Sequence, residues 1–115
     1  MEGADERAVE NASERAREKT RREAVLRDWY ASTTGAPADF TITPVAGDAS
    51  FRRYFRVEDA TGGTRILCDA PPAQEKNAEF VAVARLLARA GVRVPTVIDA
   101  DIERGFLLLE DFGDR

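Results

Sequence analysis

Apolar side chains are spaced differently in successive parts of the chain. Up to Glu23 the sequence consists almost entirely of charged and small residues, with no apolar stripe that a packed helix could bury. Glu18 and Arg22 nevertheless stand four residues apart in the order that favours a helix. We therefore expect residues 1–23 to form a charged extension, as frayed helix or disorder.

A short helix is expected next. Its apolar residues recur at helical spacing within residues 24–32: Val25, Leu26, Trp29 and Tyr30. The Gly, Pro and Ser/Thr content of the stretch that follows predicts a loop. Residues 24–38 are thus interpreted as a short amphipathic helix and its loop.

From Phe40 the apolar period changes to two, which is typical of strands. The predicted elements are, in chain order, strands at 40–47, 51–59 and 64–70, a helix at 73–91, and strands at 92–101 and 106–110. Short turns join the first three strands, which predicts an antiparallel meander. The last strand, "FLLLE", is apolar on both faces and so should be covered on both. We interpret residues 39–115 as one α+β domain.

Composition narrows the classes of function. The chain has 115 residues, a net charge of −4 and a pI near 4.9, a balance that disfavours nucleic-acid binding. One cysteine and no histidine exclude an internal disulfide, a Cys/His zinc site and histidine acid–base catalysis. No apolar run approaches the ~20 residues of a membrane span or resembles a signal peptide. We therefore expect no membrane partner and a cytoplasmic setting.

One triplet raises a question about chemistry. Asp111, Phe112 and Gly113 spell the motif whose aspartate holds catalytic magnesium in protein kinases. In those enzymes the triplet follows a catalytic loop of His-x-Asp type. Because the chain contains no histidine, we interpret the match as a coincidence.

Four stretches carry a family resemblance. In chain order they are "GDASFRRYFRV" at 47–57, "CDAPPAQE" at 68–75, "LLARAGVRVP" at 86–95 and "DIERGFLLLEDFGD" at 101–114. Together they resemble the N-terminal lobe of the aminoglycoside phosphotransferase family. Within it they look closest to bacterial kinases that phosphorylate the anomeric hydroxyl of N-acetylmuramate and N-acetylglucosamine in cell-wall recycling. The implied fold is a protein-kinase-like N-terminal lobe, with a five-stranded antiparallel sheet and one main helix after the third strand, here preceded by a charged N-terminal helix.

The resemblance also implies a function. Such a lobe binds ATP, while the catalytic base, the magnesium ligands and most of the sugar site belong to a second lobe. We therefore expect an ATP-binding lobe that is truncated at the hinge, is inactive alone and uses Mg²⁺ only together with the missing lobe. No catalytic residue and no metal ligand is assigned within this chain.

The hinge of the family lies directly behind the fifth strand, where main-chain groups bind the edge of the adenine ring. This position corresponds to Glu110, Asp111 and Phe112. Because recognition there uses main-chain N–H and C=O groups, we expect the identity of the side chains to matter little.

A phosphate-covering loop is implied at the tip of the first hairpin. It comprises Gly47, Asp48, Ala49, Ser50 and Phe51, whose small members let main-chain N–H groups approach phosphate. Asp48 departs from the family, where a second glycine is usual, and a carboxylate there would repel a triphosphate. From the residue types alone, an ordinary hairpin turn is the favoured interpretation, and the resemblance reverses that preference.

The residue at the position of the phosphate-binding lysine of kinases departs from the usual pattern. Aligned on "RILCDAPP", that position falls on Cys68, which we interpret as a small buried thiol. Arg52 or Arg53 could supply the missing charge, and Arg53 is assigned to the nucleotide site, whereas Arg56 is expected on a solvated strand face. Glu79 matches the helix glutamate that normally pairs with the lysine. It would then either bind Arg53 or face solvent.

A function of another class is also compatible with the sequence. The chain could be a non-catalytic nucleotide- or protein-binding module. The fifth strand and the hinge would then expose apolar surface for self-association. A defined oligomer in sedimentation would favour this module, and progressive aggregation would favour a kinase fragment.

Overall fold

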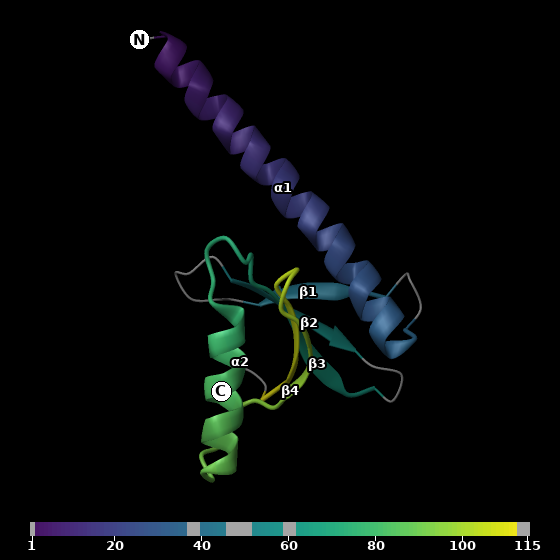
Figure 1. Cartoon of the computed structure of the whole chain (residues 1–115). Coiled ribbons are helices and arrows are strands. Elements are labelled where there is room, and N and C mark those ends of the chain that lie inside the picture. Colours follow the sequence, from purple (N-terminus) through teal and green to yellow (C-terminus); the bar gives the residue numbers. More distant parts are fainter. Residues whose placement is uncertain (1, 37–39, 46–51, 59–61, 113–115) are drawn as a thin grey trace.

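The computed structural model describes residues 2–36, 40–45, 52–58 and 62–112, with side chains from residue 7 onward. Its elements are, in chain order, α1 (Glu2–Thr34), β1 (Ile42–Val45), β2 (Arg53–Glu58), β3 (Thr64–Asp69), α2 (Asn77–Arg89), β4 (Val97–Asp101) and β5 (Phe106–Glu110) (Figure 1). This order confirms the predicted α+β class, with a charged N-terminal helix and one main helix after the third strand.

The strands form one five-stranded antiparallel sheet in the order β1-β2-β3-β5-β4. The first three are the predicted meander, and β5 then returns between β3 and β4. Strands therefore border β5 on both sides, and its residues Phe106 to Leu109 are all buried. The prediction that this strand is covered on both faces is confirmed.

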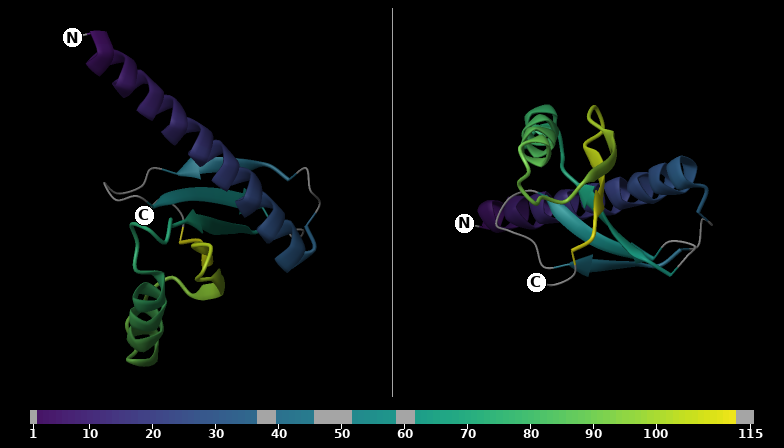
Figure 2. Two further views of the ribbon diagram at one scale, coloured as in Figure 1. Left: turned by 45° about the horizontal axis from the view of Figure 1, so that its top comes forward. Right: turned by 90° about the horizontal axis from the view of Figure 1, so that it is seen from below.

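Each face of the sheet carries its own apolar cluster, because side chains alternate along the strands. The cluster on the α1 face consists of Leu26, Trp29, Tyr30, Phe55, Val57, Leu67, Phe106 and Leu108. The cluster on the α2 face consists of Cys68, Ala70, Val81, Leu107 and Leu109. The two helices thus cover opposite faces of the sheet and do not pack along each other (Figure 2).

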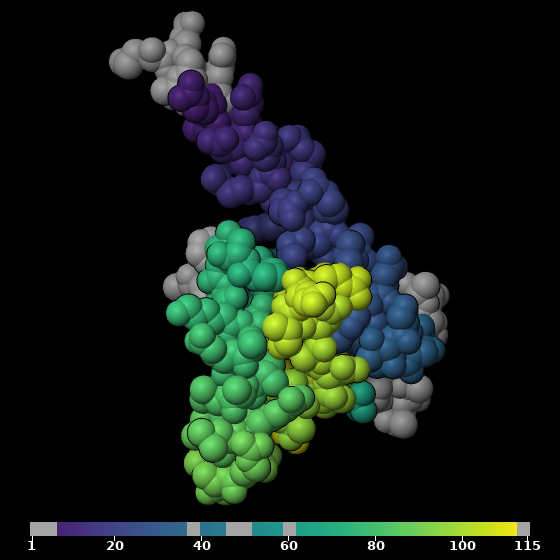
Figure 3. Space-filling model, in the orientation of Figure 1, coloured from purple at the N-terminus to yellow at the C-terminus, as the bar shows by residue number. Residues whose placement is uncertain are grey.

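α1 is much longer than the helix expected at about 24–32. Its side chains from Arg7 to Arg21 are exposed, and this N-terminal part extends away from the body of the protein (Figures 1 and 3). It has no apolar stripe, but it is rich in Ala, Glu and Arg, which favour helix without tertiary packing. The part that packs on the sheet provides the formed turns from which such a helix extends. Within the described ranges, neither helix combines the length and the apolar character needed to cross a bilayer.

Prolines set two element boundaries. α2 begins at Asn77 rather than at residue 73, because the chain after Pro71 first forms a turn in which Gln74 N and Glu75 N donate to the Pro71 carbonyl. β4 begins at Val97, after Pro95, which has no N–H to give to a ladder.

The turn from Asp101 to Gly105 joins β4 to β5 and contacts the end of β3. The Asp101 carboxylate accepts hydrogen bonds from Arg104 Nε at 2.7 Å and from Arg104 N at 3.1 Å, and these lower the pKa of Asp101. Gly105 has a φ of +81°, and its carbonyl accepts a 2.7 Å hydrogen bond from Ala70 N. A Cβ at this glycine would lie only 2.1 Å from the Ala70 carbonyl oxygen. The position therefore requires glycine for both its conformation and its close contact.

Candidate functional site

The segment behind β5 is held to the sheet by one carboxylate. Arg56 Nε donates to Asp111 Oδ2 at 2.7 Å, and Thr64 Oγ1 donates to the same oxygen at 2.7 Å. The Asp111 side chain is only 3% exposed. Its charge is therefore neutralised by an arginine of β2, and the carboxylate serves to position the chain after β5 against β2 and β3.

Two expectations change in consequence. Arg56 does not lie on a solvated strand face, because its guanidinium is bound to Asp111 and only 27% of its side chain is exposed. The expectation that side-chain identity matters little now concerns adenine recognition alone, because the Asp111 carboxylate makes these contacts and so positions the segment.

The other residues behind β5 also have defined contacts. Glu110 N donates to the Thr96 carbonyl at 2.9 Å, and Thr96 N donates back to Glu110 Oε1 at 3.2 Å. The Arg93 guanidinium lies 4.5 Å from the centroid of the Phe112 ring. The segment is thus fixed on one side by β2 and β3 and on the other by the loop that precedes β4.

We predict that the Arg56–Asp111 contact contributes a measurable coupling to stability. Asp111→Asn and Arg56→Gln should each lower the free energy of unfolding, because each leaves a largely buried partner without its counter-charge. The double variant should lose at least about 1 kcal/mol less than the sum of the single losses. Urea denaturation of the four proteins measures this coupling.

A matched cycle pairs Arg56→Gln with Glu103→Gln, an exposed acid in the turn before β5. The losses in free energy of unfolding of these two single variants should add in their double variant. Additive losses in the Arg56/Asp111 cycle as well would contradict a positioning role for the Asp111 carboxylate.

The α2 face of the sheet carries an arginine next to the start of α2. The Arg52 guanidinium lies 4.3 Å from the centroid of the Phe80 ring, and its Nη2 lies 3.5 Å from Glu75 Oε2. Arg52, Lys76 and Glu79 provide the charged side chains of a pocket of about 440 Å³. The rest of its lining is apolar and comes from α2, the loop before β4, and β5: Phe80, Val83, Ala84, Leu87, Val94, Pro95 and Leu109.

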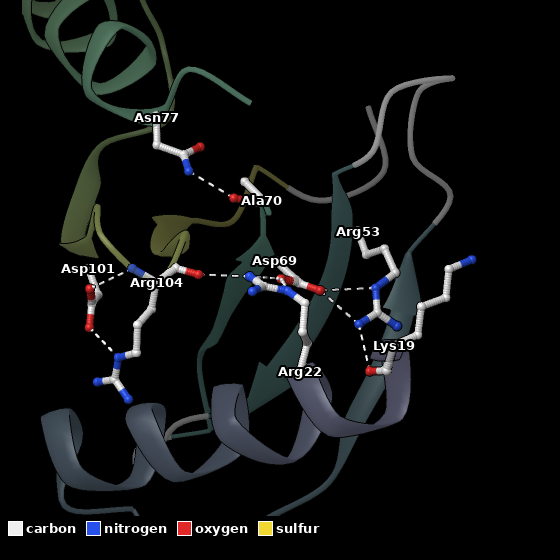
Figure 4. A network of polar contacts seen from close by, with 8 residues as sticks. All are labelled: Lys19, Arg22, Arg53, Asp69, Ala70, Asn77, Asp101 and Arg104. Carbon is white, nitrogen blue, oxygen red and sulfur yellow. Dashed lines mark hydrogen bonds and ion pairs between the residues drawn. The ribbon is translucent and has the colours of Figure 1, made fainter. Parts of the chain in front are cut away.

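Arg53 lies on the opposite face. Its Nε and Nη2 donate to Asp69 Oδ2 at 3.1 and 2.7 Å, and Nη2 also donates to the Lys19 carbonyl of α1 at 3.0 Å. Arg22 of α1 donates to the other carboxylate oxygen of Asp69 at 2.8 Å (Figure 4). Asp69 is only 1% exposed, so two arginines share one buried carboxylate.

This arrangement gives Arg53 a structural role on the α1 face. The expected alternative, a pair between Arg53 and Glu79, is wrong, because Arg53 is bound to Asp69 on the α1 face while Glu79 is exposed on α2. Side chains of neighbouring strand residues point to opposite faces, so Arg52 rather than Arg53 reaches the end of α2 that carries Glu79.

The remaining predicted residues fall into two groups. Cys68 is fully buried in the α2-face cluster, which confirms a small buried thiol. The predicted phosphate loop from Gly47 to Phe51 lies outside the described residues. Among the residues that are described, no group of three or more His, Cys, Asp or Glu side chains could hold a metal ion.

Sequence reasoning missed Arg22 as a structural residue. The charge pattern predicts a solvated extension at this position, yet Arg22 donates to Asp69 and also, through Nη2, to the Arg104 carbonyl at 2.8 Å. One signal was available in the sequence. Asp69 follows the predicted buried Cys68, and a buried aspartate needs a cationic partner, which the arginines of the charged segment could provide.

Comparison of the sequence with known proteins identifies relatives of this chain. Residues 41–115 match APH, the phosphotransferase enzyme family. The N-acetylmuramate/N-acetylglucosamine kinase of Pseudomonas aeruginosa is 54% identical over 74 residues, which cover 63% of this chain and 21% of that protein.

Two further relatives have the same name. The protein from Pseudomonas putida is 52% identical over 75 residues, 65% of this chain and 22% of the relative. The protein from Neisseria meningitidis serogroup B is 38% identical over 93 residues, 81% of this chain and 27% of the relative. The chain thus spans about a fifth to a quarter of the length of these relatives. Because the family match extends over more than half of its residues, the chain belongs to the phosphotransferase enzyme family APH.

Proposed function

We propose that this chain is the ATP-binding lobe of a small-molecule kinase that phosphorylates a hydroxyl of an amino sugar in cell-wall recycling. The observation that carries the proposal is the match of residues 41–115 to the phosphotransferase family, on a sheet whose last strand leads into a segment with fixed contacts. The printed names of the relatives support an amino sugar as the acceptor.

The contacts behind β5 suit recognition of a purine edge by the main chain. The N–H of Glu110 already donates to Thr96, so the main-chain N–H contacts to adenine fall to Asp111 and Phe112. The Asp111 carboxylate holds that stretch in place through Arg56 and Thr64. A segment fixed in this way binds a planar base with little loss of conformational entropy.

Phosphoryl transfer in the proposal needs residues that this sequence lacks. When Mg²⁺ is bound to ATP, it neutralises charge that develops on the phosphates. The Asp111 carboxylate is bound to Arg56 and is not proposed as its ligand. A second lobe would provide the magnesium ligands and the catalytic base, and the acceptor would reach the nucleotide from that side.

We predict that the purified chain binds ATP and ADP but transfers no phosphate. Isothermal titration calorimetry with ATP, ADP and adenosine measures binding. Incubation with MgATP and N-acetylmuramate or N-acetylglucosamine, read by mass spectrometry, measures transfer. Binding of all three ligands without a sugar phosphate above the no-enzyme control is the expected result. Sugar phosphate formed by this chain would refute the proposal that a second lobe provides the catalytic groups.

A non-catalytic module that binds a protein is the second candidate. The fifth strand does not expose the apolar surface expected of it, because Phe106 to Leu109 are buried in the sheet. Apolar side chains are instead exposed on α2 and in the loop after it: Val83, Leu86, Leu87 and Val92. Such a surface favours association with another polypeptide. A folded chain that binds none of the three nucleotide ligands would support this candidate over the kinase lobe.

A further inference from the structure

We propose that Arg52 is the phosphate-binding cation of this lobe and that Glu75 orients it. In protein kinases, a lysine on the third strand does this work and is paired with a glutamate of the helix that follows. The inference rests on the proposed function, because it names the residue that recognises the phosphates of the bound nucleotide.

The third strand cannot provide the cation. Cys68 stands at the position of the lysine and is fully buried among Ala70, Val81 and the leucines of β5. Its neighbour Asp69 carries the opposite charge and points to the α1 face, where it binds Arg22 and Arg53. A nucleotide phosphate on the α2 face therefore needs a positive charge from another element.

Arg52 places that charge beside the start of α2. Its guanidinium lies 4.3 Å from the Phe80 ring centroid, so the first turn of α2 fixes its position. Only 16% of its side chain is exposed, and 12% of that of Glu75. Arg52 and Glu75 thus pair a cation with a carboxylate, as the lysine and the helix glutamate do in protein kinases. Here the carboxylate comes from the turn before α2 and not from Glu79.

The two arginines of β2 are assigned to other contacts. Arg53 and Arg56 lie 2.7 Å from Asp69 and Asp111, respectively, and both serve to hold elements together. Arg52 Nη2 lies 3.5 Å from Glu75 Oε2, on the face of the sheet that α2 covers. A phosphate oxygen is a strong acceptor for the planar donors of a guanidinium, and Glu75 limits the directions that Arg52 can take.

The pocket beside Arg52 is lined by further charged side chains. Lys76 and Glu79 line the same volume of about 440 Å³, whose other walls are apolar. Arg52 and Lys76 place two cations at this end of α2, beside the carboxylates of Glu75 and Glu79, and Arg52 is the one whose position Phe80 fixes. The expected specificity is for nucleotides with a β-phosphate, so that ADP and ATP bind tighter than adenosine.

The test compares nucleotide affinity of the 115-residue chain with that of Arg52→Gln, using ATP, ADP and adenosine in calorimetric titrations. Arg52→Gln should weaken ATP and ADP binding about tenfold, the effect of one charge-assisted contact, and leave adenosine unchanged. Arg52→Lys should lose less, because it keeps the charge without the planar donors. The control Arg85→Gln removes the same charge from an exposed position of α2 and should change none of the affinities.

Adenosine affinity serves as the internal measure of folding in each variant. A wild-type chain that binds no nucleotide overturns the proposed function and this inference with it. A wild-type chain that binds ATP, with the same ratio of ATP to adenosine affinity in Arg52→Gln, overturns the inference alone. Equal losses for ATP and adenosine in Arg52→Lys would likewise assign Arg52 a structural role and overturn it.

Discussion

Replacing Asp69 by asparagine is expected to lower the free energy of unfolding by about 3 kcal/mol or more. The carboxylate is 1% exposed and accepts hydrogen bonds from Arg22 of α1 and Arg53 of β2. Asparagine would leave two guanidinium groups, 18% and 25% exposed, without the negative charge that compensates for their burial. The loss should include the attachment of α1 to the sheet, which the apolar α1-face cluster alone would then maintain.

Chemical denaturation monitored by the fluorescence of Trp29 measures this loss, since Trp29 belongs to the α1-face cluster. Arg22→Gln and Arg53→Gln should each cost less than Asp69→Asn, because one arginine still pairs with the carboxylate. Glu103→Gln provides the matched control, as it removes an acid from an exposed turn. A loss for Asp69→Asn no larger than that for Glu103→Gln would show that the buried pairs do not hold α1.

Gly105→Ala is expected to cost about 3 kcal/mol, through two effects at one residue. Gly105 has a φ of +81°, a conformation that an alanine adopts at a cost of about 1 kcal/mol. An added Cβ would also lie 2.1 Å from the Ala70 carbonyl oxygen, so the turn would have to move away from the end of β3. That movement would weaken the 2.7 Å hydrogen bond from Ala70 N to the Gly105 carbonyl.

Gly91→Ala separates the two effects. Gly91 has a similar φ of +85°, but nothing lies within 4 Å of the position of its Cβ. This control should therefore show the conformational cost of about 1 kcal/mol and no more. Thermal unfolding of both variants gives the comparison, and equal losses would exclude the contact with Ala70 as the cause.

The sheet could be predicted from sequence because its signals are local. An apolar period of two, interrupted by turn residues, was enough to locate the strands, and "FLLLE" indicated a strand covered on both faces. The extent of α1 could not be predicted from the same rule. Hydrophobic periodicity reports which residues pack, whereas the exposed residues from Arg7 to Arg21 are helical through local propensity.

The site was less predictable because its contacts join residues distant in sequence. Arg56 and Asp111 are separated by 55 residues, and Arg22 and Asp69 by 47. Arg52 and Arg53 are adjacent and chemically identical, so composition does not separate them. The pleat of the sheet separates them: Arg53 contacts α1, and Arg52 contacts Phe80 of α2. Once the strand register is known, it tells which face of the sheet each arginine occupies and therefore which helix the arginine contacts.

The extended end of α1 changes how the size of this molecule is measured in solution. Its radius of gyration is 16.2 Å and its principal extents are 56 × 33 × 28 Å, whereas a compact domain of this length has a radius of gyration of about 13 Å. A single copy of 12.7 kDa therefore diffuses slowly for its mass and leaves a gel-filtration column early. Elution volume alone would make such a monomer look like a pair, so its stoichiometry has to be taken from light scattering.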